Sequence, residues 1–338
     1  MTAGETEAMS AAVLGGTLRY CAPLLLASSG ELVSERSGVV NIGIEGMMLA
    51  GAFGGALSAG LLVGWGYGGV EWGWLAWICW MVAGAFGAGM GLLFAGLVVG
   101  LGRDQIVAGL ALNLLAIGGT SSLHFVIEQR RSGGVSDLSL GGLGFGPMVA
   151  GSDAGSVLGS LGLQPGALVW AMLSLPLCWL WLERTRPGLR LRAAGDHPGA
   201  VDTAGLRVGR IRTGACVFGG WMAGLAGGYL SLALTRSFSD NMTAGTGFVA
   251  LALVIFGRWQ AGWIMLAGLF FGFLSAMRPA LQGSESLREA LRPVLGEIRI
   301  DTTYPLVEAV PYVLTLLTLA GLAGRSRAPA GLGRPYHR

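Results

Sequence analysis

The chain has 338 residues, of which 53% are hydrophobic and only 12% are charged, about half the charged share of a soluble domain. With a mean hydropathy of +0.63, these values exclude a soluble globular protein and a disordered chain. The net charge of +3 gives no sign of nucleic-acid binding. All 22 basic residues are arginine, so no lysine is available for an ATP-binding P-loop or a Schiff base. The remaining fold class is all-α, a polytopic transmembrane helix bundle.

Apolar stretches of about 20 residues predict about nine membrane segments, with a range of about eight to ten. The stretch near 246–257 is too short to cross as a straight helix, which favours a half-helix or a re-entrant piece. An N-terminal tail of residues 1–10 precedes the first segment, and the transmembrane domain covers 11–323. The segments lie near 11–30, 38–63, 73–101, 106–127, 167–183, 213–235, 246–257, 261–278 and 304–323.

The placement of the arginines predicts the orientation of the bundle. Seven arginines lie in the stretch 184–212, and the tail 324–338 contains four arginines and no acidic residue. We therefore expect both regions on the cytoplasmic side. Counting back through the segments puts 34–37 and 103–104 on the same side. The N-terminus and a Gly- and Ser-rich loop at 128–165 then lie outside.

The 60 glycines recur at four-residue spacing within several predicted segments. Small residues at this spacing flatten one face of a helix and allow two backbones to approach closely. We expect these glycines to form packing faces, and the alternative is that some of them let helices slide during transport. The pairs are Gly51/Gly55, Gly60/Gly64, Gly87/Gly91, Gly96/Gly100, Gly220/Gly224 and Gly224/Gly228.

Three polar residues within the predicted segments are candidates for a substrate pathway. An ionisable side chain such as Glu45 is costly in hydrocarbon and is usually functional or paired. Asn41 precedes Glu45 by one helical turn, which predicts a shared face. Asn113 lies in the middle of its segment. The alternatives are that Glu45 pairs with Arg36 or a neighbouring helix near the cytoplasmic interface and that Asn113 makes hydrogen bonds between helices.

The sequence offers no clear chemistry for catalysis or metal binding. The four cysteines lie in apolar segments without a CxxC pair, and His124 has no Cys or second His nearby. These patterns support neither a disulfide framework nor a metal site. No catalytic or cofactor motif is present either. We therefore expect a transport subunit that is not an enzyme and binds no cofactor.

The basic stretch 184–212 contains a short predicted helix. Asp196 is the expected N-cap, Pro198 stands in the first turn, and Gly205 can end the helix. Such a helix can be an ordinary surface element. Because it lies between two membrane segments on the cytoplasmic side, it can also be a docking element for a cytoplasmic partner.

One stretch resembles the signature of permease subunits of bacterial ABC importers: Gly30-Glu-Leu-Val-Ser-Glu-Arg-Ser-Gly-Val-Val-Asn-Ile-Gly-Ile-Glu-Gly-Met-Met48. The resemblance is to the simple-sugar and nucleoside branch, and it is strongest to nucleoside-type permeases. Further similar stretches are 245–259 and 311–317. Residues 194–205 resemble the coupling-helix loop of that family, although histidine stands where asparagine is more usual. The resemblance assigns to this ATPase-coupling loop Gly195, Asp196, His197, Pro198, Ala200, Asp202 and Gly205.

The resemblance covers about residues 20–325 and implies a multi-protein transporter in a bacterial cytoplasmic membrane. Its parts would be two permease subunits, as a homodimer or heterodimer, two separate ATPase subunits and an extracytoplasmic substrate-binding protein. The separate ATPase would account for the missing P-loop lysine. The implied activity is import of nucleosides or related small polar solutes by alternating access, and a simple sugar such as a pentose is the alternative. A stand-alone secondary transporter is a further alternative, but it would need several intramembrane ionisable residues.

Overall fold

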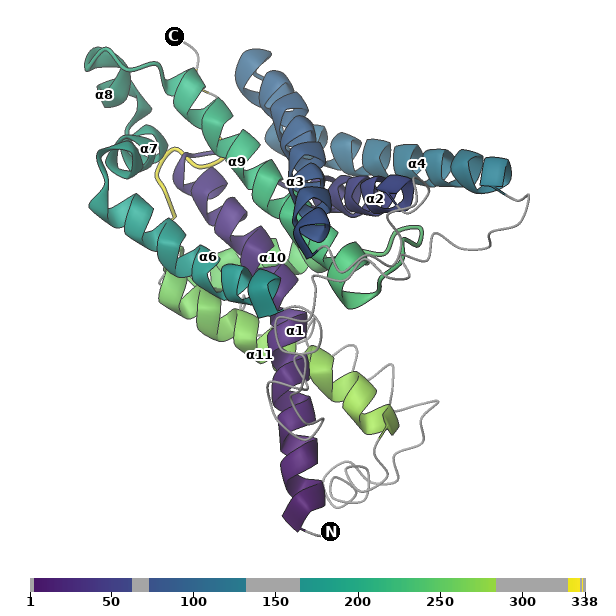
Figure 1. Ribbon diagram of the computed structural model, residues 1–338. Coiled ribbons are helices and arrows are strands. Elements are labelled where there is room, and N and C mark those ends of the chain that lie inside the picture. The colour runs from purple at the N-terminus through teal and green to yellow at the C-terminus, as the bar shows by residue number, and fades with distance from the viewer. Residues whose placement is uncertain (1–2, 63–72, 132–164, 284–327, 335, 337–338) are drawn as a thin grey trace.

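The computed structural model describes residues 3–62, 73–131, 165–283, 328–334 and 336. Within these ranges every regular element is a helix, which confirms the all-α prediction (Figure 1). Two helices continue into π-helical segments. The α-helices are α1 (Ala3–Arg36), α2 (Ile44–Leu62), α3 (Gly73–Ala95), α4 (Gln105–Arg131), α6 (Pro165–Arg184), α7 (Arg186–Asp196), α8 (Pro198–Thr203), α9 (Val208–Gly228), α10 (Thr246–Phe256) and α11 (Ala261–Gly283), and the π-helical segments are η2 (Gly96–Gly100) and η3 (Tyr229–Leu234).

In the part of the chain that the structure describes, five helices are long and apolar enough to cross a membrane. They are Ile44–Leu62, Leu75–Gly100, Gln105–Gln129, Gly166–Arg184 and Val208–Leu234, and two shorter apolar helices are Thr246–Phe256 and Ala261–Met277. The short helix expected near 246–257 is therefore present as α10. The predicted ninth segment and most of the loop 128–165 lie outside the described residues, and so do 324–327, 335 and 337–338 of the tail.

Two predicted boundaries differ from the structure near the N-terminus. α1 begins at Ala3, so most of the predicted tail 1–10 is helical, because alanine, glutamate and methionine in this stretch are strong helix formers. The second segment begins at Ile44 and not near residue 38. Gly38 has a φ of +92°, a backbone conformation that ends α1 and cannot continue a right-handed helix.

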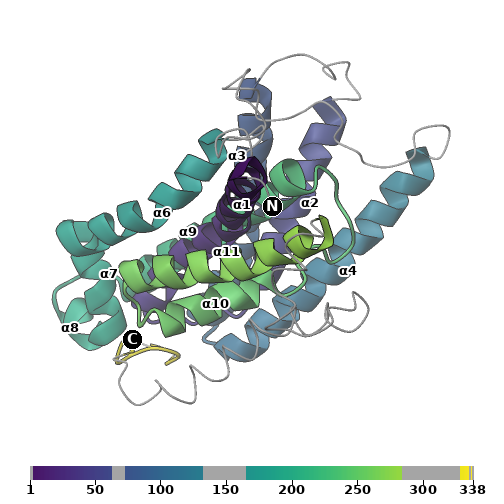
Figure 2. The same cartoon turned by 90° about the horizontal axis from the view of Figure 1, so that it is seen from below.

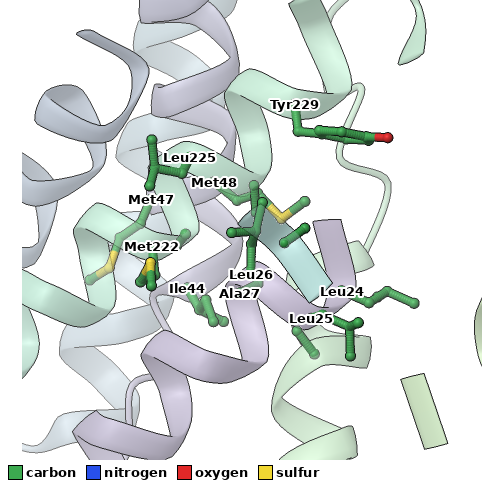
Figure 3. Packing of buried hydrophobic residues seen from close by; sticks show 14 of the residues in the cluster. Leu24, Leu25, Leu26, Ala27, Ile44, Met47, Met48, Met222, Leu225 and Tyr229 are labelled. Atoms are coloured by element: carbon green, nitrogen blue, oxygen red, sulfur yellow. The ribbon is translucent and has the colours of Figure 1, made fainter. Parts of the chain in front are cut away.

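α2 and α9 form the centre of the bundle. α9 packs against α1, α2 and α3, and 83% of the apolar window of α2 is buried. Figure 3 shows Met47 and Met48 of α2 beside Met222 and Leu225 of α9. α10 and α11 lie along α1 (Figure 2). The centre is thus a continuous apolar contact between helices that are far apart in the sequence.

The outer helices expose one apolar face. Only 33% of the apolar window of α4 is buried, and Leu114 and Val107 on this helix are 70% and 66% exposed. A contiguous apolar surface of this kind would be an association site in water. It suits contact with lipid tails, since hydrocarbon gives no penalty for an exposed leucine.

Glycines bring α9 into close contact with α3 and α2. A Cβ atom on Gly87 would lie 2.2 Å from the carbonyl oxygen of Gly220, and one on Gly51 would lie 2.4 Å from Cα of Gly224. The predicted packing faces are confirmed at these positions. The prediction is wrong for Gly96 and Gly100, whose Cβ positions have no atom within 4 Å. Both lie in η2, where the wider π-helical turn no longer stacks residues four apart.

We predict that Gly87→Ala lowers the thermal midpoint of the purified protein. The new methyl group meets backbone atoms of α9, and such overpacking costs about 1–3 kcal/mol. Gly89→Ala on the same helix is the matched control, because its Cβ position is open and alanine favours the helix by about 1 kcal/mol. Thermal unfolding in detergent measures both, and equal midpoints for the two variants would contradict close packing at Gly87.

Candidate functional site

A buried polar break separates α1 from α2. The backbone N–H of Asn41 donates to Oε1 of Glu31 at 3.1 Å, and the N–H of Val40 donates to Oε1 of Gln105 at 2.8 Å. Side chains thus replace the helical acceptors that the break removes. Asn41 lies in this connection and not on α2, so the predicted helical face shared with Glu45 is wrong. The reason is the turn at Gly38, which delays the start of the second helix.

Glu45 joins the N-terminal ends of two helices. It is 4% exposed and stands in the first turn of α2. Its Oε1 accepts a hydrogen bond from the N–H of Gly245 at 2.8 Å, and its Oε2 accepts one from the N–H of Gly247 at 2.7 Å. These groups begin α10, so the carboxylate acts as an N-cap supplied by another helix. Of the predicted alternative, the contact with a neighbouring helix is present. The pair with Arg36 is wrong, because that guanidinium donates to the carbonyl of Trp259 at 2.8 Å.

Asn113 holds α4 against the start of α2. Its Oδ1 accepts from the N–H of Gly46 at 2.8 Å, and its Nδ2 donates to the carbonyl of Ile42 at 3.0 Å. The hydrogen bonds between helices that the sequence offered as an alternative are therefore present. They satisfy one of the free N–H groups that every helix start leaves. A direct role of Asn113 in a substrate pathway stays a prediction.

Sequence reasoning missed two buried acids on α1. The side chains of Glu31 and Glu35 are 0% and 1% exposed. The indole N–H of Trp259 donates a hydrogen bond to Glu35. Oε2 of Glu31 and Oδ1 of Asn41 are buried and accept no hydrogen bond from the described residues. The available signal was the four-residue spacing of the two glutamates at the end of an apolar helix. Together with Asn41 and Glu45, they make the break between α1 and α2 the most polar part of the described core.

The predicted short helix of the basic loop is present as α8. Its N-cap is His197 and not Asp196, because α7 continues through Asp196. The Asp196 carboxylate instead lies 3.4 Å from the backbone N–H of Ala330, which donates to it. Gly205 has a φ of +79°, and this left-handed conformation follows the helix as predicted.

α8 is fastened to the bundle through one apolar side chain. Val201 is 5% exposed and packs with Ala194 and Val208. Gly199 and Ala200 are exposed on the same short helix. α8 therefore presents a surface of small side chains to its surroundings while its buried side is fixed.

Arg212 ties the end of α1, the end of α7 and the C-terminal segment to α9. The residue is 4% exposed, and its guanidinium donates to three backbone carbonyls. The donor–acceptor distances are 3.2 Å to Ser37, 2.9 Å to Arg334 and 3.5 Å to Ala194. The sequence alone counted Arg212 as one of seven basic residues. Its position inside the apolar start of α9 was the signal that distinguished it.

The regions predicted to share the cytoplasmic side lie at one end of the bundle. The N–H of Gly331 donates to the carbonyl of Gly195 at 2.8 Å, and that of Gly333 donates to the carbonyl of Gly38 at 3.2 Å. A Cβ atom on Gly195 would lie 2.2 Å from the carbonyl oxygen of Arg36. The N-terminus lies at the opposite end from α7 and α8 (Figure 1).

His124 has an acidic partner that the sequence pattern did not reveal. Its Nδ1 lies 3.2 Å from Oδ1 of Asp240, and its ring packs edge-on against Phe238. Within the described ranges, no group of three or more His, Cys, Asp or Glu side chains could hold a metal ion. The pair therefore links α4 to the connection that follows η3.

The sequence profile described as "Branched-chain amino acid transport system / permease component" matches residues 13–318. The chain is 34% identical to the guanosine ABC transporter permease protein NupQ of Bacillus subtilis over 96% of each protein. It is 32% identical to the nucleoside ABC transporter permease protein NupC of Lactococcus lactis, again over 96% of each. It is 31% identical to the putative glucose ABC transporter permease protein TsgC13 of Haloferax volcanii, over 97% of this chain and 98% of that protein.

A second guanosine ABC transporter permease protein of Bacillus subtilis, NupP, is also similar. It is 23% identical over 77% of this chain and 72% of its own length. One organism thus has two different permeases with the same named solute. No solved structure matches the chain significantly.

We predict that Glu45→Ala lowers the thermal midpoint strongly and that Glu45→Gln lowers it less. Alanine leaves the N–H groups of Gly245 and Gly247 buried without an acceptor, at about 1–3 kcal/mol each. Glutamine keeps one acceptor oxygen. Thermal unfolding in detergent measures the effect. A Glu45→Ala protein with an unchanged midpoint would contradict the capping role.

Proposed function

The chain belongs to this permease family of ABC transporters, and we propose that it carries nucleosides or closely related small polar solutes into the cell. As an ABC importer permease it is a multi-pass membrane transport subunit with no catalytic activity, and an ATPase is part of the same system. Family membership excludes the stand-alone secondary transporter. The observation that carries the solute class is the similarity to NupQ and NupC over 96% of the chain.

A simple sugar is the second candidate solute. TsgC13 is named a putative glucose permease and is 31% identical over nearly the whole chain, a value close to those of the two relatives named for nucleosides. Nucleosides and pentoses share a ribose-type ring with several hydroxyl groups. Both classes would therefore be bound by amide and carboxylate groups such as those in the break between α1 and α2.

We assign the substrate pathway to the neighbourhood of Asn41, Glu45 and Asn113. Among these, Asn41 has a buried side-chain oxygen that accepts no hydrogen bond from the described residues. Glu45 and Asn113 use their oxygens to hold backbone groups. In this proposal Asn41 faces the solute at one stage of the cycle, while the other two hold the helix starts that shape the path.

We further propose that α8 receives the motion of the ATPase. The coupling loop then comprises Gly195, Asp196, His197, Pro198, Ala200, Asp202 and Gly205. The exposed small residues of α8 suit insertion into a groove of a partner. Because Arg212 links the loop to both α1 and α9, a displacement of α8 would be passed to the central helices. ATP-driven closure could in this way alternate the side to which the bundle is open.

The partners of this chain are, in this proposal, two ATPase subunits, an extracytoplasmic binding protein and a second permease. The pair NupP and NupQ supports a heterodimer of two different permeases. The basic regions at the α7–α8 end support placing that end in the cytoplasm of a bacterial cell, according to the positive-inside rule.

Uptake by the reconstituted transporter tests the solute class. We expect ATP-dependent accumulation of radiolabelled guanosine in vesicles that contain the permeases, the ATPase and the binding protein. Unlabelled adenosine or uridine should compete, while glucose and ribose should not. Competition by the sugars without competition by the nucleosides would establish the second candidate and overturn the first.

Co-purification of the ATPase tests the coupling assignment. We expect Ala200→Trp to reduce the recovered ATPase by roughly tenfold, the effect of a strong interface substitution, since the indole would stand on the exposed side of α8. Ser239→Trp is the matched control, because Ser239 is exposed but lies in the connection between η3 and α10. Undiminished ATPase recovery and coupled uptake with Ala200→Trp would refute the assignment.

A further inference from the structure

A deep groove runs between α6 and α9, and we call it the α6–α9 groove. Its volume is about 710 Å³, within the range of pockets that hold small molecules, about 300–1,000 Å³. α1 and α7 contribute to its walls. Most of its lining is apolar, including Trp170, Leu177 and Trp181 from α6 and Phe218 and Met222 from α9. An apolar groove on the outside of a membrane bundle is open to lipid unless a protein covers it.

Two arginines stand at one end of the α6–α9 groove. Arg190 lies on α7 and Arg210 lies in the first turn of α9, and both line the groove and are exposed. Neither makes an ion pair or a hydrogen bond through its side chain to a described residue. The neighbouring Arg192 differs, because it pairs with Glu183 at 2.8 Å. The groove therefore combines an apolar channel with two cationic groups at its mouth.

The length of the groove matches one leaflet of a bilayer. From Trp170 to Trp181 the helix α6 rises about 16 Å, and from Arg210 to Met222 the helix α9 rises about 18 Å. Half of the hydrocarbon core of a bilayer is about 15 Å. With Arg190 and Arg210 at the headgroup level, the far end of the groove lies near the midplane. The groove thus has the length of one lipid chain, from headgroup to chain end.

We propose that the α6–α9 groove binds an anionic phospholipid of the cytoplasmic leaflet. Arg190 and Arg210 hold its phosphate, for which the guanidinium is suited by its charge and its fork of donors. One acyl chain lies along Leu177 and Phe218. The leaflet assignment rests on the proposed function, which places α8 beside the cytoplasmic ATPase. Arginine clusters at the cytoplasmic ends of membrane helices attract anionic lipids for the same electrostatic reason.

A lipid in the α6–α9 groove would contact the helices on both sides of the coupling loop. The coupling loop is connected to α6 through α7 and to α9 directly, and the groove touches all three helices. A bound lipid would therefore link the two helices that flank the loop. We expect anionic lipid to stabilise this end of the bundle, where α8 meets its partner.

Native mass spectrometry of the full chain in detergent tests the proposal, with phosphatidylglycerol and phosphatidylcholine as probes. We expect the wild-type chain to retain phosphatidylglycerol in preference to phosphatidylcholine. The double variant Arg190→Gln/Arg210→Gln should lower the apparent affinity for phosphatidylglycerol by about tenfold or more, since hydrogen bonds to charged groups are the strong ones. Arg207→Gln is the matched control, because this arginine is exposed but does not line the groove.

A second variant tests the apolar part of the site separately. Gly214 lines the groove, and its Cβ position has no atom within 4 Å, so Gly214→Phe should fill the groove without disturbing the backbone. We expect loss of both phospholipids from this variant, with an unchanged thermal midpoint in detergent without added lipid. Wild-type lipid retention in both variants would overturn the proposal. So would a thiol-specific crosslink from Gly214→Cys to the second permease subunit, because a protein would then cover the groove.

The lipid measurement is independent of transport. A chain that retains phosphatidylglycerol at Arg190 and Arg210 but imports no nucleoside would overturn the proposed solute and leave the lipid site standing. A transporter that imports nucleosides, while both variants retain phosphatidylglycerol as the wild type does, would overturn the lipid site and leave the proposed solute standing.

Discussion

Burial of helix ends inside the bundle is the constraint on which the described structure depends. α2 and α10 begin within the protein, where their first N–H groups cannot reach bulk water and each unsatisfied group would be costly. Glu45 accepts from two of these groups on α10, and Asn113 accepts from one on α2. The polar residues in the apolar segments are therefore placed where the helices are interrupted. A chain of uninterrupted helices would have no need of them.

Close backbone contact between helices is the second main feature of the structure. α9 packs against α1, α2 and α3 at positions where a single methyl group would meet backbone atoms. Such contacts involve few large side chains, so one helix can move along another without unpacking a core of interlocked leucines. The polar hydrogen bonds at the helix starts and the glycine contacts between helices have different roles. The polar contacts stabilise the interrupted helices, and in the proposed transport cycle the glycine faces would allow whole helices to shift.

The end that carries α8 is held by backbone hydrogen bonds from one buried cation. Arg212 reaches carbonyls from α1, α7 and the C-terminal segment, which belong to distant parts of the sequence. Because all three acceptors are backbone atoms, the arrangement constrains the path of the chain more than the identity of its side chains. In the proposed function, a force applied at α8 would reach the central helices through this polar junction. The α6–α9 groove borders the same junction through Ile211 and Leu191.

The amino-acid sequence by itself determined the fold class, the helical segments between residues 44 and 277, the short helix α10 and the position of α8. These follow from local properties: apolar run length, the fixed φ of Pro198 and the left-handed conformation that Gly205 adopts. The motif Gly30–Met48 also indicated the transporter family. Only the tertiary structure decided what the polar residues contact. Glu45 lies 200 positions from Gly245 in the chain, and Arg212 lies 175 positions from Ser37. No local sequence pattern encodes such partners. They depend on how the helices pack, because packing determines which buried backbone groups lack a hydrogen-bond acceptor or donor.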